Sequence, residues 1–400
     1  MMQYPYTLNF CFDRMSNPGV LGYPNLARES LSPDEFDHTW PRAIPCRLFV
    51  YFKRHNIHVS QCLVSDAPKG SWYPVAIAWF DFNCDYISLI PKSTIDRIRA
   101  GDIKILFYYH EGDNPNHIKS RIESLLTAHG LSRNNYLFVT ANSKSADLKQ
   151  FYFFPDHEFF FHYINRRQGA TPVDLQSKSY QFTVLNRSHK WWRASVMADL
   201  QRSGLLENSL WSYNTTIDVG DREEDNPLQL DIDNNWRQEV KKFVSQGPYF
   251  CDPLNDNDHN DHRLVVTSLY TQSYCHLILE THFDADSSNG TFITEKTYKC
   301  FKYAQPFVMI GPPGTLRILR EHGYRVFDQV IDNRYDEIAD NTQRWLAVKN
   351  TIAKLKQLDL HQWYLACYPD IKHNQEHFIN GNRELLDQLI VKLTTDFDSV

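Results

Sequence analysis

The chain has 400 residues, enough for two or three domains, and 42% of them are apolar, enough for sizeable cores. A formal net charge of -6 excludes a protein that binds polyanions through an overall basic charge. No run reaches the roughly 20 apolar residues of a membrane span, and the N-terminus has neither the basic start nor the apolar core of a signal peptide. The eight cysteines are scattered without a Cys-x-x-Cys, which is typical of reduced thiols. We therefore expect a cytoplasmic protein, located in the host cytoplasm if the source is viral.

The first half of the chain alternates strand-like and helix-like segments. Apolar runs of strand length lie at 47–52, 74–80, 104–109 and 136–140, helical patterns lie at 117–129 and 145–151, and a strand-like aromatic run covers 151–163. Strands separated by helices predict parallel pairing and a layered α/β fold.

The second half repeats this alternation after a polar segment with Gly and Pro. Strands are expected at 180–185, 264–269 and 306–310, with a mixed apolar run at 273–280; helices are expected at 190–202, 235–244, 295–303, 315–321, 342–355 and 383–393. The predicted domains are 1–165 on the acceptor side, a linker at 166–178, a nucleotide-sugar domain at 179–345, and C-terminal helices at 346–400. We expect two Rossmann-type α/β domains facing a cleft, with the final helices returning across it.

The segment 291–311 is the most informative part of the sequence. Glu295 and Lys296 open a helical pattern, and an apolar strand and a Gly/Pro loop that starts at Gly311 follow. A helix start offers N–H groups and a positive dipole end that suit a phosphate. The lysine adds a point charge for a diphosphate, and the carboxylate suits ribose hydroxyls. Tyr298, about one turn from Glu295, is predicted to line the same site. A solvated helix end is the alternative.

A second cluster of polar residues follows the expected strand at 180–185. Asn186, Arg187, Lys190 and Arg193 lie where that strand runs into a helix. Ligands of open parallel sheets bind at the carboxyl ends of strands, and an arginine there suits a diphosphate. A basic helix start on the surface is the alternative.

The first half offers a general base after the expected strand at 104–109. Glu111 is the first candidate, followed by Asp113 and His110, because sugar transfer needs a group that takes the proton of the acceptor hydroxyl. The alternative is that Asp113 or Asn114, just before Pro115, caps a helix.

Together these segments resemble the α-1,3-fucosyltransferase-like glycosyltransferases, best over about 180–325. The matching positions are Phe292, Thr294, Glu295, Lys296 and Gly311 in one segment, Asn186 and Arg193 in another, Glu111, Asp113, Pro115 and Asn116 in the loop, and Glu280 upstream. Similar segments also occur in virus- and phage-encoded glycosyltransferases of unassigned donor. The family has a tyrosine where this chain has Phe292, so any hydroxyl contact from that position is lost.

The resemblance implies a GT-B fold and an inverting transfer of a sugar, fucose from GDP-fucose, to a hydroxyl of a glycan or glycoconjugate. Arg193, Glu295 and Lys296 would hold the nucleotide and diphosphate, and Glu111 would be the base, with Asp113 next. The family needs no metal for the chemistry, so we expect neither a metal site nor a cofactor beyond the sugar nucleotide. The acidic net charge makes nucleic acid an unlikely partner.

Three other functions stay open. The turns Asp231–Asp233, Asp256–Asp258 and Asp284–Asp286 each fit the Asp-x-Asp of metal-dependent glycosyltransferases. A transferase acting on modified DNA bases is the second alternative. The third is a non-catalytic protein that binds a glycan or a nucleotide.

Overall fold

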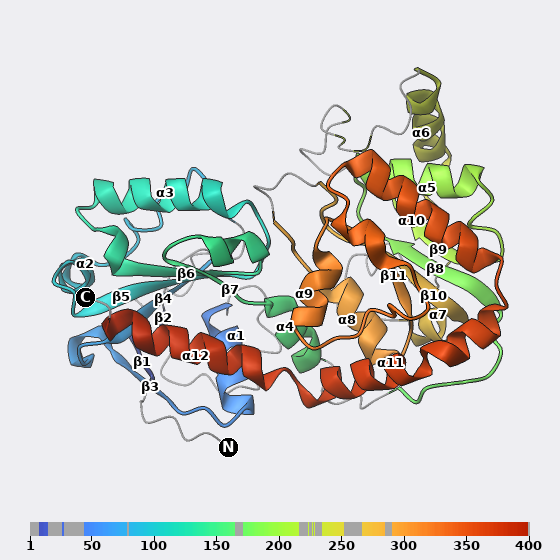
Figure 1. Cartoon of the computed structure of the whole chain (residues 1–400). Coiled ribbons are helices and arrows are strands. Elements are labelled where there is room, and N and C mark those ends of the chain that lie inside the picture. Colours follow the sequence, from blue (N-terminus) through green and yellow to red (C-terminus); the bar gives the residue numbers. More distant parts are fainter. Residues whose placement is uncertain are drawn as a thin grey trace. The chain divides into compact units, whose positions relative to one another are not determined.

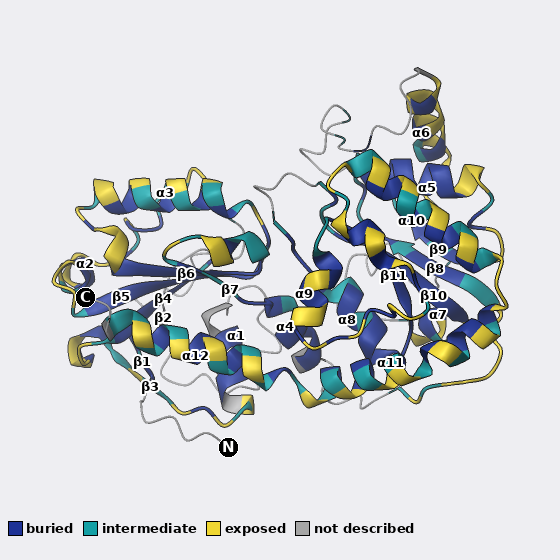
Figure 2. Cartoon of the chain, viewed as in Figure 1, coloured by how far each residue is buried: buried dark blue, intermediate teal, exposed yellow. Residues whose placement is uncertain are grey.

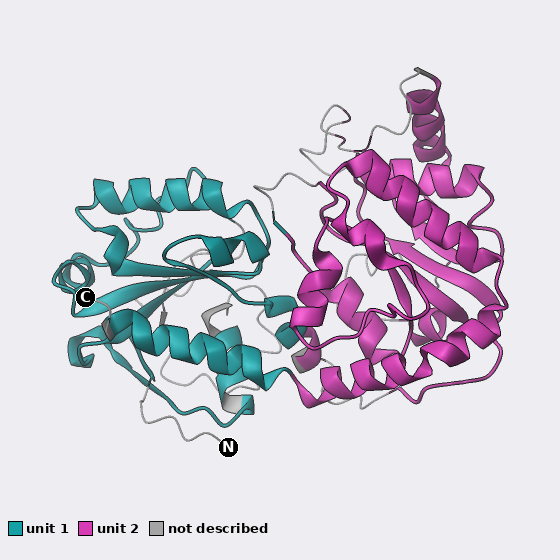
Figure 3. Cartoon of the chain, in the orientation of Figure 1, with its two compact units in different colours: residues 1–160, 287–290, 382–400 teal, residues 161–286, 291–381 magenta. Residues whose placement is uncertain are grey.

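The computed structural model describes residues 8–14, 26–27, 44–77, 80–164, 171–215, 223, 226, 228, 234–251, 266–284 and 290–398. The chain divides into two compact units (Figure 3). Unit 1 comprises 1–160, 287–290 and 382–400, and unit 2 comprises 161–286 and 291–381. Each unit is described by itself.

Unit 1 is built on a parallel sheet with the strand order β2-β1-β4-β5-β6-β7, and β3 pairs with β1 (Figure 1). Its strands are β1 (Leu8–Arg14), β2 (Leu26–Ala27), β3 (Val59–Leu63), β4 (Ser71–Ile77), β5 (Ile103–Tyr109), β6 (Tyr136–Thr140) and β7 (Phe151–Phe153). The register places Tyr109 beside Thr140, so the chain leaves β5 and β6 at the same edge of the sheet.

The central strands of unit 1 are buried on both faces, as expected for parallel strands covered by helices (Figure 2). Ile105, Phe107 and Tyr109 share one hydrophobic cluster with α2 (Lys92–Arg99) and α3 (Pro115–Ala128). The alternate residues face the other way: Tyr108 contacts Asp156, and Lys104 donates to the main chain of α12 (Arg383–Asp398). The period-2 alternation of strands therefore puts helices on both faces.

The last helix of the chain, α12, belongs to unit 1. The Trp72 indole donates to the Leu393 carbonyl at 3.0 Å, and the Trp72 and Phe397 rings meet edge to face at 4.8 Å. The helix α1 (Ile44–Arg54) packs in the same unit, and α4 (Asp156–Ile164) runs across the boundary between the units.

Unit 2 has a smaller parallel sheet with the order β11-β10-β8-β9. Its strands are β8 (Tyr180–Asn186), β9 (Leu210–Tyr213), β10 (Ser273–Leu279) and β11 (Phe307–Ile310). Its helices are α5 (Trp191–Arg202), α6 (Asn234–Gln246), α7 (Thr267–Thr271), α8 (Glu295–Lys302), α9 (Thr315–Glu321), α10 (Asn341–Lys356) and α11 (Leu360–Asn380).

The predicted α/β class is confirmed, since each unit has a parallel sheet with helices and the chain ends in helices. Three local predictions are wrong, and the short helix expected at 145–151 is a 3-10 helix over Ser143–Asp147 instead. The run 47–52 lies in α1, where Arg47 and Tyr51, four residues apart, both contact Asp156, which is helical spacing. The aromatic run 151–163 breaks near Pro155 into β7 and α4, and Thr267–Thr271 is helical instead of extended. The residue ranges predicted for the domains and the linker, and the predicted cleft, stay predictions.

Within the described ranges, none of the helices combines the length and the apolar composition that crossing a bilayer requires.

Buried histidines make the fold sensitive to acid. Burial lowers the pKa of His276, on β10, from 6.5 to about 3. The folded state therefore keeps this ring neutral where the unfolded chain takes up a proton, and the free energy of unfolding falls as pH drops below 6.5. The loss is at most about 1.4 kcal/mol per pH unit for one histidine. Urea unfolding between pH 7 and pH 5 should show a shallower pH dependence for His276→Gln than for the unsubstituted protein. The exposed control His58→Gln should keep the original slope, and equal slopes in all three proteins would contradict the prediction.

Candidate functional site

Three polar or turn segments of unit 2 leave the sheet at the same edge. β8 ends at Asn186, β10 is followed by Glu280, and β11 is followed by Gly311. Because these neighbouring strands are parallel, their carboxyl ends lie together, which is where ligands of open sheets bind. The structure thus brings together the segments that the sequence singled out around Asn186 and 291–311.

The centre of this edge is the Glu280 carboxylate, which is fully buried. It accepts hydrogen bonds from the Thr294 hydroxyl at 2.7 Å, the Thr297 hydroxyl at 2.6 Å, and the main-chain N–H groups of Thr281 and Thr294, both at 3.2 Å. A buried carboxylate is stable only when its oxygens are bonded in this way. Glu280 therefore fixes the chain that enters α8.

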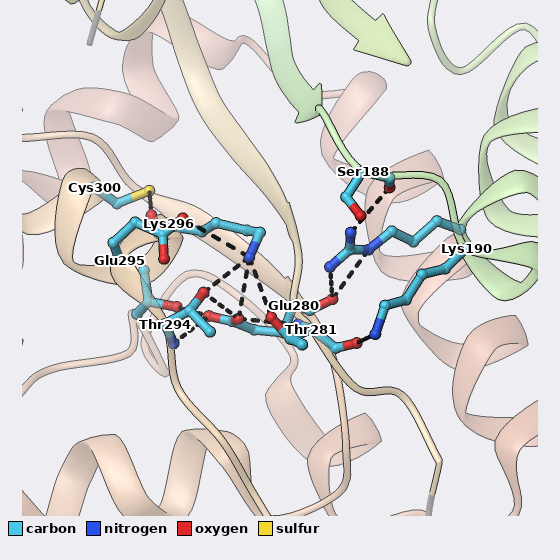
Figure 4. A network of polar contacts seen from close by, with 10 residues as sticks. Ser188, Lys190, Glu280, Thr281, Thr294, Glu295, Lys296 and Cys300 are labelled. Carbon is cyan, nitrogen blue, oxygen red and sulfur yellow. Dashed lines mark hydrogen bonds and ion pairs between the residues drawn. The ribbon is translucent and has the colours of Figure 1, made fainter. Parts of the chain in front are cut away.

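Glu295 and Lys296 begin α8 with side chains that are 15% and 23% exposed. The Lys296 ammonium lies 3.0 Å from the Thr294 hydroxyl, 3.4 Å from the Thr281 hydroxyl and 3.9 Å from a Glu280 oxygen (Figure 4). A partly exposed lysine at a helix start, with its ammonium beside two hydroxyl groups, suits an anionic ligand.

The start of α5 contributes two further cations. Lys190, the N-cap residue of α5, donates to the Thr281 carbonyl at 3.0 Å. The buried Arg193 guanidinium donates to the Glu280 carbonyl at 2.6 and 3.2 Å and to the Ser188 carbonyl at 3.1 Å (Figure 4). Arg193 therefore ties the turn after β8 to the chain after β10, and its direct contact with a diphosphate stays a prediction.

Several positive charges lie close together around the start of α8. Burial lowers the pKa of Lys299, and the charges of Lys296 and Arg187 act in the same direction against the raising effect of Glu295. Lys296 and Lys299 are three residues apart on α8, so they share one face of the helix. A bound polyanion would relieve this repulsion.

Gly311 packs against the same edge, with room for a Cβ in ordinary contact. A Cβ at this position would lie 3.4 Å from the Glu280 Cβ and 3.6 Å from the Thr315 hydroxyl. The Gly311 carbonyl accepts from the buried Arg344 guanidinium at 3.1 Å, and Arg344 also donates to the carbonyl of Phe283. Arg344, which the sequence analysis did not single out, therefore braces two of the turns.

Phe292, Asn186 and Tyr298 are further predicted site residues that lie in the protein interior. Phe292 and Asn186 are 2% and 1% exposed, and Asn186 accepts a main-chain hydrogen bond from Asn214 at 2.9 Å. Tyr298 is fully buried among the rings of Phe301, Tyr324 and Phe378. This placement favours a packing role for Tyr298.

Unit 1 presents a second polar edge, at the carboxyl ends of β5 and β6. The Thr140 hydroxyl donates to the Glu111 carbonyl at 2.9 Å, and the Asn142 amide donates to the Gly112 carbonyl at 2.8 Å. Asn114 caps α3 by accepting from the Asn116 N–H at 3.0 Å, and the Asp113 carboxylate accepts from the Tyr109 hydroxyl. The capping alternative thus holds for Asn114. The loop after β5 is held by Thr140, the last residue of β6, and by Asn142, which follows it.

The geometry of this loop favours Glu111 as a proton acceptor. Its carboxylate is 22% exposed and lies 3.3 Å from Nε2 of the buried His110. Burial lowers the pKa of His110, the Arg47 charge lowers it further, and Glu111 opposes both effects. A carboxylate has no proton to give, so the neutral imidazole donates its Nε2–H and orients Glu111.

A buried ion pair between Arg47 and Asp156 lies close enough to His110 to affect its pKa. Asp156 accepts from Arg47 at 2.7 Å and from the hydroxyls of Tyr51 (3.1 Å) and Tyr108. Sequence analysis missed Arg47 and Asp156 because nothing local connects residues 109 positions apart. It also missed Thr281, Thr297 and Asn142. These residues could have been found, because each is a polar residue that closely follows an expected strand or begins an expected helix.

Among the described residues, no group of three or more His, Cys, Asp or Glu side chains is placed to hold a metal ion. The Asp231, Asp233, Asp256, Asp258 and Asp286 carboxylates of the three Asp-x-Asp turns lie outside the described residues. Asp284 is described and accepts from the Asn341 amide at 3.1 Å.

No protein-family model and no curated protein matches this sequence. A solved structure that does match is a crystal structure of the DNA modifying enzyme β-glucosyltransferase, with and without its substrate uridine diphosphoglucose. The match covers 98% of this chain and 97% of that one, with 11% sequence identity and a TM-score of 0.38. At that level of similarity it assigns no residue and no activity.

One prediction about partners needs correction. The expectation that nucleic acid is an unlikely partner is contradicted by this neighbour, a DNA modifying enzyme, and is withdrawn. The expectation rested on the net charge of the whole chain, which says nothing about a local surface. The neighbour is also a glucosyltransferase that uses a uridine nucleotide, so it does not support the fucosyltransferase family or GDP-fucose.

Replacing Glu280 should destabilise unit 2 specifically. Glu280→Gln places an amide N–H₂ against groups that already donate, and we expect a loss of about 3 kcal/mol in the free energy of unfolding. The control Glu321→Gln changes a carboxylate that is 56% exposed and should stay within about 0.5 kcal/mol. Urea denaturation measures both. Equal stability of the two variants would show that the Glu280 network does not hold this edge together.

Proposed function

We propose that the protein is a glycosyltransferase that moves a sugar from a nucleoside diphosphate donor to a hydroxyl group. The observation that carries the proposal is the start of α8, where Glu295 and the Lys296 ammonium are held by the buried Glu280 network. Arg187, Lys190 and Lys299 add positive charge around them. This arrangement suits a diphosphate, with the Glu295 carboxylate for hydroxyls of the ribose or sugar.

In the proposed reaction Glu111 acts on the acceptor and Lys296 acts on the donor. Glu111 takes the proton of the acceptor hydroxyl as its oxygen attacks the anomeric carbon of the donor, and the bond from that carbon to the diphosphate breaks with inversion. Neutral His110 holds the Glu111 carboxylate in position by its hydrogen bond. Lys296 offsets the negative charge that develops on the leaving diphosphate, which lowers the barrier most in a site that excludes water.

The identities of the donor and of the acceptor are more specific proposals. The resemblance of segment 291–311 to fucosyltransferases favours GDP-fucose and an acceptor hydroxyl on a glycan. A uridine diphosphate sugar and duplex DNA with a hydroxyl on a base are tested beside them, because the structural neighbour uses uridine diphosphoglucose and modifies DNA.

Donor binding is tested by thermal shift with nucleoside diphosphates and their sugars, with and without EDTA. We expect one nucleotide to raise Tm in EDTA as well, because cations of the protein hold the diphosphate. Lys296→Ala should weaken that nucleotide at least tenfold, since a hydrogen bond to a charged group contributes about 1.5–3 kcal/mol. The control Lys372→Ala, on the exposed side of α11, should leave the shift unchanged.

Other results of the same panel would redirect the proposal. A shift that requires Mg²⁺ or Mn²⁺ would move the donor site to an Asp-x-Asp turn. If no nucleotide changes Tm, the proposed donor site at α8 is wrong.

The base is tested by turnover once a donor is known. Glu111→Gln should lower kcat by about 10²–10⁴-fold with donor affinity unchanged, because only the proton acceptor is lost. Glu123→Gln, a carboxylate of the same unit on α3, is the matched control and should keep full activity. Retained activity in Glu111→Gln with a loss in Asp113→Asn would move the base to Asp113. Retained donor binding without turnover in the unsubstituted protein, for every acceptor tested, would favour a non-catalytic binding protein.

A further inference from the structure

Unit 1 contains a half-open cavity of about 670 Å³ that neither candidate site uses. It lies at the amino ends of the strands, against Lys104 in β5, Tyr136 in β6 and Phe151 in β7. Glu111 follows the other end of β5, about 20 Å away at the rise of a β-strand. The volume is within the range of small-molecule sites.

Two further elements complete the walls of the cavity. Gln388, Lys392 and Asp396 are spaced by four residues and so share one face of α12. Ala146 and the segment 148–153, which includes Lys149 and Gln150, also line the cavity. All of these residues belong to unit 1.

The charge in the cavity is unbalanced. Lys104, Lys149 and Lys392 face one carboxylate, Asp396, which pairs with Lys392 at 2.7 Å. Lys104 is 7% exposed, donates to the Asp396 carbonyl and lies 4.8 Å over the Phe397 ring. Burial lowers the pKa of Lys104, and the nearby Lys392 charge adds to this while Asp396 opposes it. An anion in the cavity would relieve the repulsion between these lysines.

Amide groups supply the rest of the polar lining. The side chains of Asn134, Gln150 and Gln388 are amides, which contain both donor and acceptor groups, and these residues line the cavity. The Gln150 side-chain oxygen is buried and accepts no hydrogen bond from any described residue. Gln150 also holds a left-handed backbone with φ of 63°, which is uncommon outside glycine and often marks functional sites.

We propose that this cavity binds a small phosphate ester on a hydroxylated ring, that is, a sugar phosphate or a nucleotide. The lysines bind the phosphate as point charges, and the amides bind the hydroxyls or the ring. Since α12 forms one wall, the ligand bridges α12 and the amino edge of the sheet.

The test uses the full chain with Lys296→Ala, which removes the main cation of the donor site proposed above. Isothermal titration with glucose 1-phosphate, uridine monophosphate and inorganic phosphate measures affinity, and hydrogen exchange of 388–397 reports on α12. We expect one ester to bind at least tenfold more tightly than inorganic phosphate and to slow exchange in α12. Which ester binds identifies the sugar phosphate or the nucleotide as the ligand class.

A matched pair of double variants distinguishes a built site from general attraction to a basic protein. The double variant Lys149→Gln with Lys392→Gln should lower the affinity for the ester at least tenfold. Lys69→Gln with Lys372→Gln removes the same charge elsewhere and should leave the affinity unchanged. The proposal is overturned if neither ester binds, if inorganic phosphate binds equally well, or if both double variants lose affinity equally while remaining folded.

Discussion

A buried carboxylate must have its oxygens bonded, and this constraint organises the ligand edge of unit 2. Glu280 has lost all contact with solvent, and it takes hydrogen bonds from the turn that follows β10 and from the start of α8. Its main-chain oxygen receives the Arg193 guanidinium from α5. One residue therefore sets the positions of three segments, and the partly exposed side chains of Glu295 and Lys296 depend on that frame.

At the corresponding edge of the sheet in unit 1, a different set of hydrogen bonds holds the loop. The loop after β5 is held from β6 by Thr140 and Asn142 through main-chain oxygens. Behind it, the Arg47–Asp156 pair is buried and bonded to two tyrosines, which keeps a charged pair stable in the interior. The positive charge of Arg47 helps to keep His110 neutral, so the imidazole donates to Glu111 instead of competing with it for a proton.

Four cationic residues near the ligand edge of unit 2 fall into two groups by environment. Arg193 and Arg344 are buried and donate to main-chain oxygens, so they stabilise turns. Lys296 has a partly exposed side chain whose ammonium lies beside hydroxyl groups, and the charges of Lys296 and Arg187 act on Lys299. The first group fixes the geometry, and the second supplies the charge that an anionic ligand would neutralise.

The sequence by itself determined the features that depend on neighbouring residues. Alternating strand and helix patterns predicted the parallel α/β class, and the polar residues after β5 and β8 and at the start of α8 were found because parallel sheets collect ligand groups at strand ends. Asn114 before Pro115 was one of the two capping candidates. The tertiary structure decided that 47–52 is a helix, that the Arg193 guanidinium donates to carbonyl groups and that α12 packs in unit 1. Each of these outcomes depends on partners 87 to 321 residues away, and local propensity carries no information about such contacts.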